Sequence, residues 1–302
     1  MAKPPLSPVG AHVPVAGGLA KRGLSYAAEI EAEAVQVFVT NPRGWARSPG
    51  VAEQDALLRG RVEDGLPVFV HAPYLINLGT PNEEVAARSV ASLEHALRRG
   101  AEIGARGVVV HTGSAVDGTR ADGLERTRSR LLPVLEALDA DAPQVLLEPM
   151  AGQGRVLCAT VDDLGPYLGA LEDHPKAAVC LDTAHVFGAG HDISTGAGMR
   201  AMLDRFGEVA GAHRLRLVHA NDSAAACGSN RDRHANIGSG HIGAAPFAEL
   251  FTHPVSAGVP VVVETPGPVG PHSADVATLK RLRSHAAGPT PSDADRRPVP
   301  VG

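Results

Sequence analysis

Short apolar runs that end in a polar residue recur along the chain. The runs 68–71, 108–111, 145–148, 179–182, 215–219 and 261–264 end in His71, His111, Glu148, Asp182, His219 and Glu264. A run that is apolar on both faces is typical of a buried parallel strand. The runs lie about 34 to 45 residues apart, the length of a strand followed by a helix. One polar strand end is ordinary, but six of them predict strands that converge on a single polar site.

Two further apolar runs, 8–12 and 34–39, bring the number of predicted strands to eight. Segments with helical spacing of apolar residues alternate with them. We expect helices over 17–33, 52–64, 81–104, 122–138, 161–172, 198–208, 245–252 and 274–286. Asn82 is expected to cap the third of these helices, with Glu83 and Glu84 in its first turn.

This alternation predicts an α/β fold, a single-domain (β/α)8 TIM barrel over residues 1–287, with the active site at the carboxyl ends of the strands. A doubly wound open sheet is the alternative. It collects ligands at one switch point and would leave six polar strand ends unexplained. The Pro-rich segment 288–302 is expected to be a disordered tail.

The composition narrows the kind of site. The net charge of −5 gives no overall basic field for nucleic acid, although bound cations change the local sign. The three cysteines are widely spaced and form no CxxC pair, so neither a disulfide framework nor a thiolate zinc site is supported. The sequence shows no apolar signal segment and no membrane-spanning run, and we therefore expect a cytoplasmic protein without membrane association.

The polar strand ends suit metal binding better as a set than one by one. A lone strand-end histidine is more often structural, and a lone carboxylate can cap the next helix. His71 and His111 at adjacent strand ends are a stronger signal. Glu148 and Glu264 at the same barrel end would repel each other unless cations neutralised them.

Two short motifs add candidate ligands. Asp182 and His185 lie three apart in an expected loop, and Asp232 and His234 can project to one side of an extended segment. A surface salt-bridge cluster is the alternative interpretation of the second motif. The total of five His, two Asp and two Glu exceeds what one ion needs. A His-rich set without thiolates favours zinc, with manganese or iron as alternatives, and clustered divalent ions suit phosphoryl-ester hydrolysis.

The remaining histidines carry weaker signals. His12 ends the first predicted strand and is expected to line the site, and His191 and His241 lie in Gly-rich loops where they could contact substrate. His95 is expected on a helix, and we expect most of the others on the surface, namely His174, His213, His253, His272 and His285.

A series of motifs gives the pattern a family resemblance. In chain order they are Gly10-Ala11-His12-Val13, Asn41-Pro42-Arg43-Gly44-Trp45, His71-Ala72-Pro73-Tyr74-Leu75, His111-Thr112-Gly113-Ser114, Asp182-Thr183-Ala184-His185, His219-Ala220-Asn221-Asp222-Ser223, Asp232-Arg233-His234 and Glu264-Thr265-Pro266. Over residues 8–285 the chain resembles the endonuclease IV family of apurinic/apyrimidinic (AP) endonucleases, also called deoxyribonuclease IV.

The resemblance implies a TIM barrel that holds three zinc ions. His71, His111 and Glu148 would hold one ion. Glu148 would bridge to a second, held with Asp182, His219 and Glu264, and a third would use His185, Asp232 and His234.

The resemblance also implies an activity and a partner. A hydroxide bridging two ions would hydrolyse the phosphodiester 5′ to an abasic site in double-stranded DNA, which leaves 3′-hydroxyl and 5′-deoxyribose phosphate ends. Family members also remove 3′ blocking groups. Arg43, Tyr74 and Leu75 match residues that are pushed into the duplex to extrude the lesion. We expect the protein to act as a monomer.

Several positions depart from the family pattern. Pro149, Ala184 and His191 replace a polar residue, a cysteine and an aromatic residue. Ala224 and Ala235 stand where Lys and Glu are usual, and the missing Lys removes a phosphate contact.

Two rival functions remain. A single-metal sugar isomerase or epimerase of the xylose isomerase type would need only Glu148, Asp182, His219 and Glu264. A non-catalytic binder of damaged DNA would have lost ligands, and none is missing here.

Overall fold

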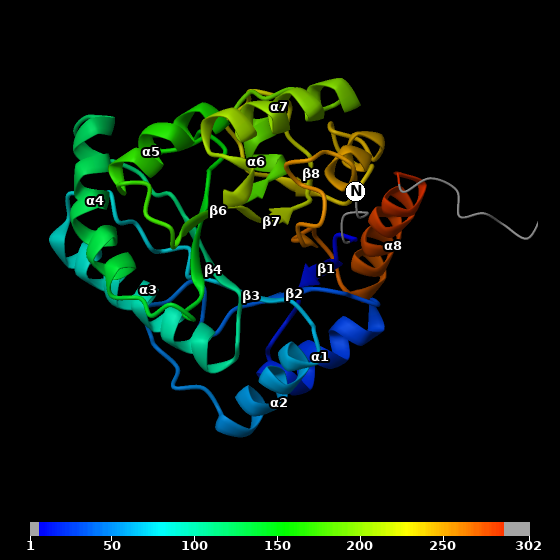
Figure 1. Cartoon of the computed structure of the whole chain (residues 1–302), viewed down its shortest axis with the longest axis horizontal. Coiled ribbons are helices and arrows are strands. Elements are labelled where there is room, and N and C mark those ends of the chain that lie inside the picture. Colours follow the sequence, from blue (N-terminus) through cyan, green and yellow to red (C-terminus); the bar gives the residue numbers. More distant parts are fainter. Residues whose placement is uncertain (1–5, 287–302) are drawn as a thin grey trace, which may run out of the picture.

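The computed structural model describes residues 6–286, and the predicted tail, 288–302, lies outside the described residues. Eight parallel strands close into a barrel in the order β1-β10-β7-β6-β5-β4-β3-β2 (Figure 1). They are β1 Val9–His12, β2 Val35–Val37, β3 Val68–His71, β4 Gly107–His111, β5 Gln144–Glu148, β6 Ala177–Asp182, β7 Leu215–His219 and β10 Val261–Val263. The TIM barrel prediction is confirmed, and closure of the sheet excludes the open doubly wound alternative.

Helices follow the strands and surround the barrel (Figure 1). The α-helices are α1 Leu19–Glu29, α2 Ala52–Glu63, α3 Glu83–Glu102, α4 Arg120–Glu136, α5 Leu164–Ala170, α6 Thr183–Gly188, α7 Gly196–Val209 and α8 Val269–Ala286. The side chain of Asn82 accepts a hydrogen bond from Val85 N at 3.0 Å, which confirms the predicted cap of α3. Among helices of the described chain, none has the length and hydropathy needed to cross a membrane.

Three local predictions were wrong. Residues 245–251 are helical as expected, but they form the 3-10 helix η3 (Ala245–Phe251) and not an α-helix, and at seven residues it is longer than most helices of this tighter kind. The helix expected over 161–172 is divided into η1 (Val161–Asp163) and α5. The loop expected after Asp182 is the short helix α6, because the Asp182 side chain caps it by accepting from His185 N.

The loop after β7 has secondary structure of its own. Its strands β8 (Asp222–Ser223) and β9 (His234–Ala235) pair antiparallel, and β9 carries one of the predicted ligands.

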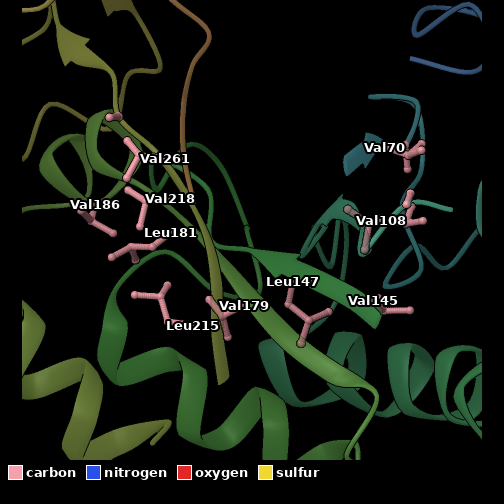
Figure 2. Close-up of a cluster of buried hydrophobic side chains, with 14 of the residues drawn as sticks. Val70, Val108, Val145, Leu147, Val179, Leu181, Val186, Leu215, Val218 and Val261 are labelled. Carbon is pink, nitrogen blue, oxygen red and sulfur yellow. The ribbon is translucent and has the colours of Figure 1, made fainter. Parts of the chain in front are cut away.

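The apolar core has two parts. An outer cluster lies between the strands and the helices, and Figure 2 shows part of it, including Val108, Leu147, Val179 and Val218. A smaller inner cluster fills the barrel, with Ala34, Phe69, Val109, Leu146, Ala178, Cys180, Leu217 and Val262. The side chains that follow this inner cluster along each strand form the floor of the candidate site.

Candidate metal centre

Each strand of the barrel contributes one polar side chain directly above the inner core. The inner residues Phe69, Val109, Leu146, Cys180, Leu217 and Val262 are followed two positions later by His71, His111, Glu148, Asp182, His219 and Glu264. Residues i and i+2 of a strand lie on the same side. The two remaining strands obey the same rule, with Gln36 above Ala34 and His12 above Gly10. The predicted set of six polar ends is therefore a ring of eight.

Gly10 shows how crowded the barrel interior is below this ring. A Cβ atom at Gly10 would lie 1.6 Å from the carbonyl oxygen of Ala34. Only glycine allows the first two strands to approach this closely.

The potential metal donors fall into three groups whose atoms lie within 4.8 Å of one another. They are His71, His111 and Glu148; Glu148, Asp182, His219 and Glu264; and Asp182, His185 and His234. Because Glu148 and Asp182 each belong to two groups, the three groups form one continuous cluster.

Asp232 completes the third group from outside the barrel. Its carboxylate oxygens lie 3.3 Å from His185 Nε2 and 3.2 Å from His234 Nε2. All nine predicted ligands therefore lie together, and Asp232 is the most exposed of them, with 39 % of its side chain accessible.

Asp222 fixes the loop that supplies this group. Its carboxylate is fully buried and accepts hydrogen bonds from the backbone N–H groups of Gly238, Gly240 and Ile242, each at 2.9 Å. The loop is thereby wrapped around β8, the strand that pairs with β9 and His234. The sequence pattern does not reveal this role, because the N–H groups that Asp222 binds lie 16 to 20 residues further along the chain.

Four of the five histidines use one ring nitrogen to bind an acceptor and direct the other into the cluster. Nδ1 lies 2.7 Å from Ala72 O in His71, 3.0 Å from Pro149 O in His185 and 3.2 Å from Glu264 O in His234. In His219 it is Nε2 that lies 2.9 Å from Gln36 Oε1. A carbonyl oxygen can only accept, so these ring nitrogens carry a proton and the opposite nitrogen is the one that can bind an ion.

Gln36 forms hydrogen bonds with three other polar side chains at the strand ends. Its Oε1 accepts from His219, while its Nε2 donates to Glu264 Oε1 at 2.6 Å and to His12 Nδ1 at 2.9 Å. His12 therefore lines the site as predicted. Gln36 was missed because it stands inside the apolar run Val35–Val37 rather than at its end. Asn221 has a similar role, since its Nδ2 donates to Asp182 Oδ2 at 2.7 Å.

Histidines and carboxylates in the cluster shift each other's ionisation. Burial alone would lower the pKa of His185, but Asp182 and Asp232 raise it to about 10. The pKa of His234 rises to about 9 against the effect of burial, through the same two carboxylates. Burial would raise the pKa of Glu148, but His219 and His111 hold it well below its usual range. Glu148 is therefore charged, and the protons held on His185 and His234 are the ones that a bound cation would displace.

The donor set fits divalent metal ions. His234 Nε2 is buried and makes no hydrogen bond of acceptable geometry, although oxygens of Asp182 and Asp232 lie within 3.4 Å. Convergence of donor atoms without pairing, together with fixed histidine tautomers, is the arrangement that a coordinated ion requires.

A cavity of about 540 Å³ opens directly above the cluster. Its walls include His111, His185, Asp232 and His234, together with Tyr74, Arg233, Glu264 and Pro266. Arg233 had no predicted role; it adds a cationic side chain to the wall of the cavity, and its backbone oxygen accepts from Ala224 N at 2.8 Å.

The residues expected to contact DNA stand on the rim of the site. The Tyr74 ring stacks on His111 with centroids 5.8 Å apart, and 47 % of Tyr74 and 38 % of Leu75 are exposed. Arg43 is also exposed, and Tyr74 N donates to Pro42 O at 3.0 Å, which joins the two loops.

Other histidines depart from their predictions. The ring of His191 accepts from Val161 N at 3.1 Å, so it has a structural contact rather than a free face toward substrate. His272 and His253 are buried, not at the surface, and Tyr26 Oη lies 2.7 Å from His272 Nδ1. His241 is exposed.

Comparison with known proteins places this geometry in a family context. A family profile described as a xylose isomerase-like TIM barrel matches residues 24–285. A protein of Streptomyces coelicolor named probable endonuclease 4 is 55 % identical over 282 residues, which cover 92 % of this chain and 96 % of the relative. The crystal structure of endonuclease IV from Thermus thermophilus superposes with a TM-score of 0.79 and 29 % identity, covering 91 % of this chain and 98 % of that one.

The same fold also occurs in sugar-converting enzymes. A D-tagatose 3-epimerase-like protein superposes with a TM-score of 0.70 at 19 % identity, covering 93 % of this chain and 98 % of that one. This likeness concerns the barrel alone.

Proposed function

The chain belongs to the endonuclease IV family, and we propose that it is a metal-dependent AP endonuclease that hydrolyses the phosphodiester 5′ to an abasic site in double-stranded DNA. The observation that carries the proposal is the continuous set of three donor groups beneath an open cavity. An enzyme that needs a single ion has no use for the second and third groups.

The nine ligands would divide among three ions. His71, His111 and Glu148 would hold the first, and Glu148 would reach the second together with Asp182, His219 and Glu264. His185, Asp232 and His234 would hold the third. Five imidazoles and four carboxylates favour zinc, and manganese or iron in part of the positions is the alternative.

When bound, such ions polarise the phosphodiester, lower the pKa of water and neutralise charge on the leaving oxygen. The side chains of this protein would position the ions and the substrate. Fixed tautomers in His71, His185, His219 and His234 hold each ligand nitrogen in place, so that little reorganisation accompanies the reaction.

Tyr74, Leu75 and Arg43 would open the duplex. Tyr74 and Leu75 are large apolar groups exposed beside the cluster, where a wedge can unstack base pairs. Because an abasic nucleotide lacks its base, it is the one that leaves the helix at least cost. The cavity above the metal donors would receive its sugar and phosphate.

The same site would also accept a strand that ends in a 3′ blocking group, since the bond to be hydrolysed is again a phosphoester. We propose that this removal is a second activity of the centre. We further propose that the protein works as a monomer in the cytoplasm.

The sugar epimerase or isomerase is the second candidate function. It is favoured only by the shared barrel and by the group of Glu148, Asp182, His219 and Glu264, which could hold one ion. It leaves the exposed Tyr74 and Leu75 without a purpose.

Incision of a defined duplex tests the proposal. The metal-loaded protein is incubated with a duplex that contains one tetrahydrofuran abasic analogue, and with the undamaged duplex of the same sequence. We expect one nick, 5′ to the analogue, whose 3′ end a DNA polymerase can extend directly. An intact abasic duplex at full metal complement would refute the proposal.

A further inference from the structure

A second pocket, of about 540 Å³, lies at the opposite mouth of the barrel. Arg106 immediately precedes β4, Gln144 begins β5 and Pro260 immediately precedes β10, so the pocket is at the amino ends of the strands. Its walls combine apolar residues such as Phe69 and Val255 with the cationic side chains of Arg106 and Arg216 and with His213. It is therefore separate from the metal centre, which occupies the carboxyl ends.

A β-bulge places one of these arginines in the pocket. Val179 of β6 pairs with Leu215 of β7, but the next residue, Cys180, pairs with Leu217, so Arg216 is an extra residue in β7. Leu215 packs in the outer cluster and Leu217 in the inner one, while Arg216 alone in this strand is exposed. A β-bulge changes the direction in which a side chain points. Bulges are frequent at the rims of barrels and beside functional sites.

The basic side chains of the pocket have no partner among the described residues. Within residues 6–286, the side chains of Arg106, His213 and Arg216 make no ion pair and no hydrogen bond, and no acidic residue of the described chain lines the pocket. Most other arginines are engaged, as Arg120 is with Asp163 and Arg130 with Glu83. Arginines without a partner among residues 6–286 are available to an anion.

We propose that this pocket binds a small phosphate-bearing ligand of about the size of a nucleotide. Two guanidinium groups suit the oxygens of a phosphate, which they can bind in bidentate fashion. Arg106 and Arg216 stand three strands apart in the barrel order, with Gln144 of β5 in the same wall. The apolar residues can cover the organic part of the ligand, and the pocket volume lies within the usual range for ligand sites.

Calorimetric titration of the metal-loaded full chain tests this assignment, with inorganic phosphate and AMP as probes at constant ionic strength. The Arg106→Gln/Arg216→Gln double variant should bind AMP at least tenfold more weakly than the wild type. Arg88→Gln removes an exposed arginine that pairs only with Glu84, and it should bind AMP as the wild type does. AMP binding tighter than that of inorganic phosphate would show that the apolar wall holds the nucleoside.

Three results would overturn the assignment. They are a wild type without saturable binding of either probe, a double variant with unchanged affinity, and a double variant that loses affinity for duplex DNA but not for AMP. If the double variant does not fold, Arg106→Lys/Arg216→Lys, which keeps the charge and loses the bidentate fork, should still weaken AMP binding. Incision of abasic DNA should stay unchanged in every variant that folds, so failure here is distinguishable from failure of the proposed nuclease function.

Discussion

Glu148 is the residue on which the cluster depends most. Its side chain is fully buried, and ring nitrogens of His71, His111, His185 and His219 all lie within 3.4 Å of its oxygens. A buried carboxylate surrounded by four imidazoles is an arrangement that suits bound metal ions.

Glu148→Gln should therefore abolish incision while DNA binding changes little. The amide keeps the shape of the side chain but removes the charge shared by two donor groups. Loss of a residue that only hydrogen-bonds to a metal ligand typically lowers activity roughly 10–100-fold. We expect the loss of incision rate in Glu148→Gln to be larger than that. Steady-state incision and fluorescence-anisotropy binding to an abasic duplex measure the two effects, and retained activity would refute the bridging role.

Gln36→Met should weaken metal binding although it replaces none of the predicted metal ligands. The variant loses the acceptor of His219 and the donor to Glu264, so zinc affinity should fall by about 10–100-fold. Competition with a chelator measures this affinity. Phe69→Leu, a change in the apolar layer below the ring, is the control and should lower stability but leave zinc affinity unaltered.

The residue types of the site were predictable, because strand ends that carry His, Asp or Glu are visible in a sequence. The contribution of β2 was not, since Gln36 lies between two valines in a three-residue strand and its role arises from barrel closure.

At the scale of elements, the two loops that carry Arg43 and Tyr74 form one rim. Tyr74→Ala/Leu75→Ala should raise the dissociation constant for abasic duplex about tenfold or more, because a stacked aromatic contact is worth roughly 1–3 kcal/mol. The bound metal should stay the same. Leu57→Ala removes an equally exposed apolar side chain from α2 and should have no effect. Equal binding by the rim variant and the control would remove these loops from DNA recognition.

The carboxylate of Glu33 is one of the groups that join helix α8 to the start of the barrel. Glu33 accepts from Val9 N at 3.1 Å and pairs with Arg283 at 2.5 Å. Burial would raise the pKa of Glu33, but the hydrogen bonds from Arg283 and Val9 hold it below the usual 4.5.

The stabilisation from Glu33 should therefore be complete above pH 4.5 and vanish as the pH falls through the lower folded-state pKa. At pH 7, Glu33→Gln should lower the free energy of unfolding by an amount on the order of 1 kcal/mol, since the group is partly exposed and screened. The difference from the wild type should shrink at acid pH in urea titrations. Glu29→Gln, which removes a 3.8 Å surface contact, is the control. A difference that grows as the pH falls would contradict the assigned role.

Elements with strong periodicity were predicted well, and those shaped by tertiary contacts were not. The third helix was found with its cap because Asn82, Glu83 and Glu84 mark its start locally. The sequence predicts a loop where helix α6 forms, because six residues carry too little periodicity and the helix depends on capping by Asp182. The hairpin of β8 and β9 depends on Asp222 gathering distant backbone N–H groups, which no local pattern reveals.

At the scale of the whole molecule, the barrel joins residues from eight strands and one long loop into a single polar centre. The six polar strand ends seen in the sequence lie together at the carboxyl end of this barrel. Whether it is a one-ion or a three-ion centre separates the sugar-converting enzymes of this fold from the nuclease proposed here.

Stepwise return of zinc to the metal-free protein, with incision of an abasic duplex recorded at each step, tests this point most directly. The three donor groups share ligands, so incision should reach its plateau only at about three equivalents of zinc per chain. Full incision at one equivalent, or none at three, would contradict a centre in which all three groups act together.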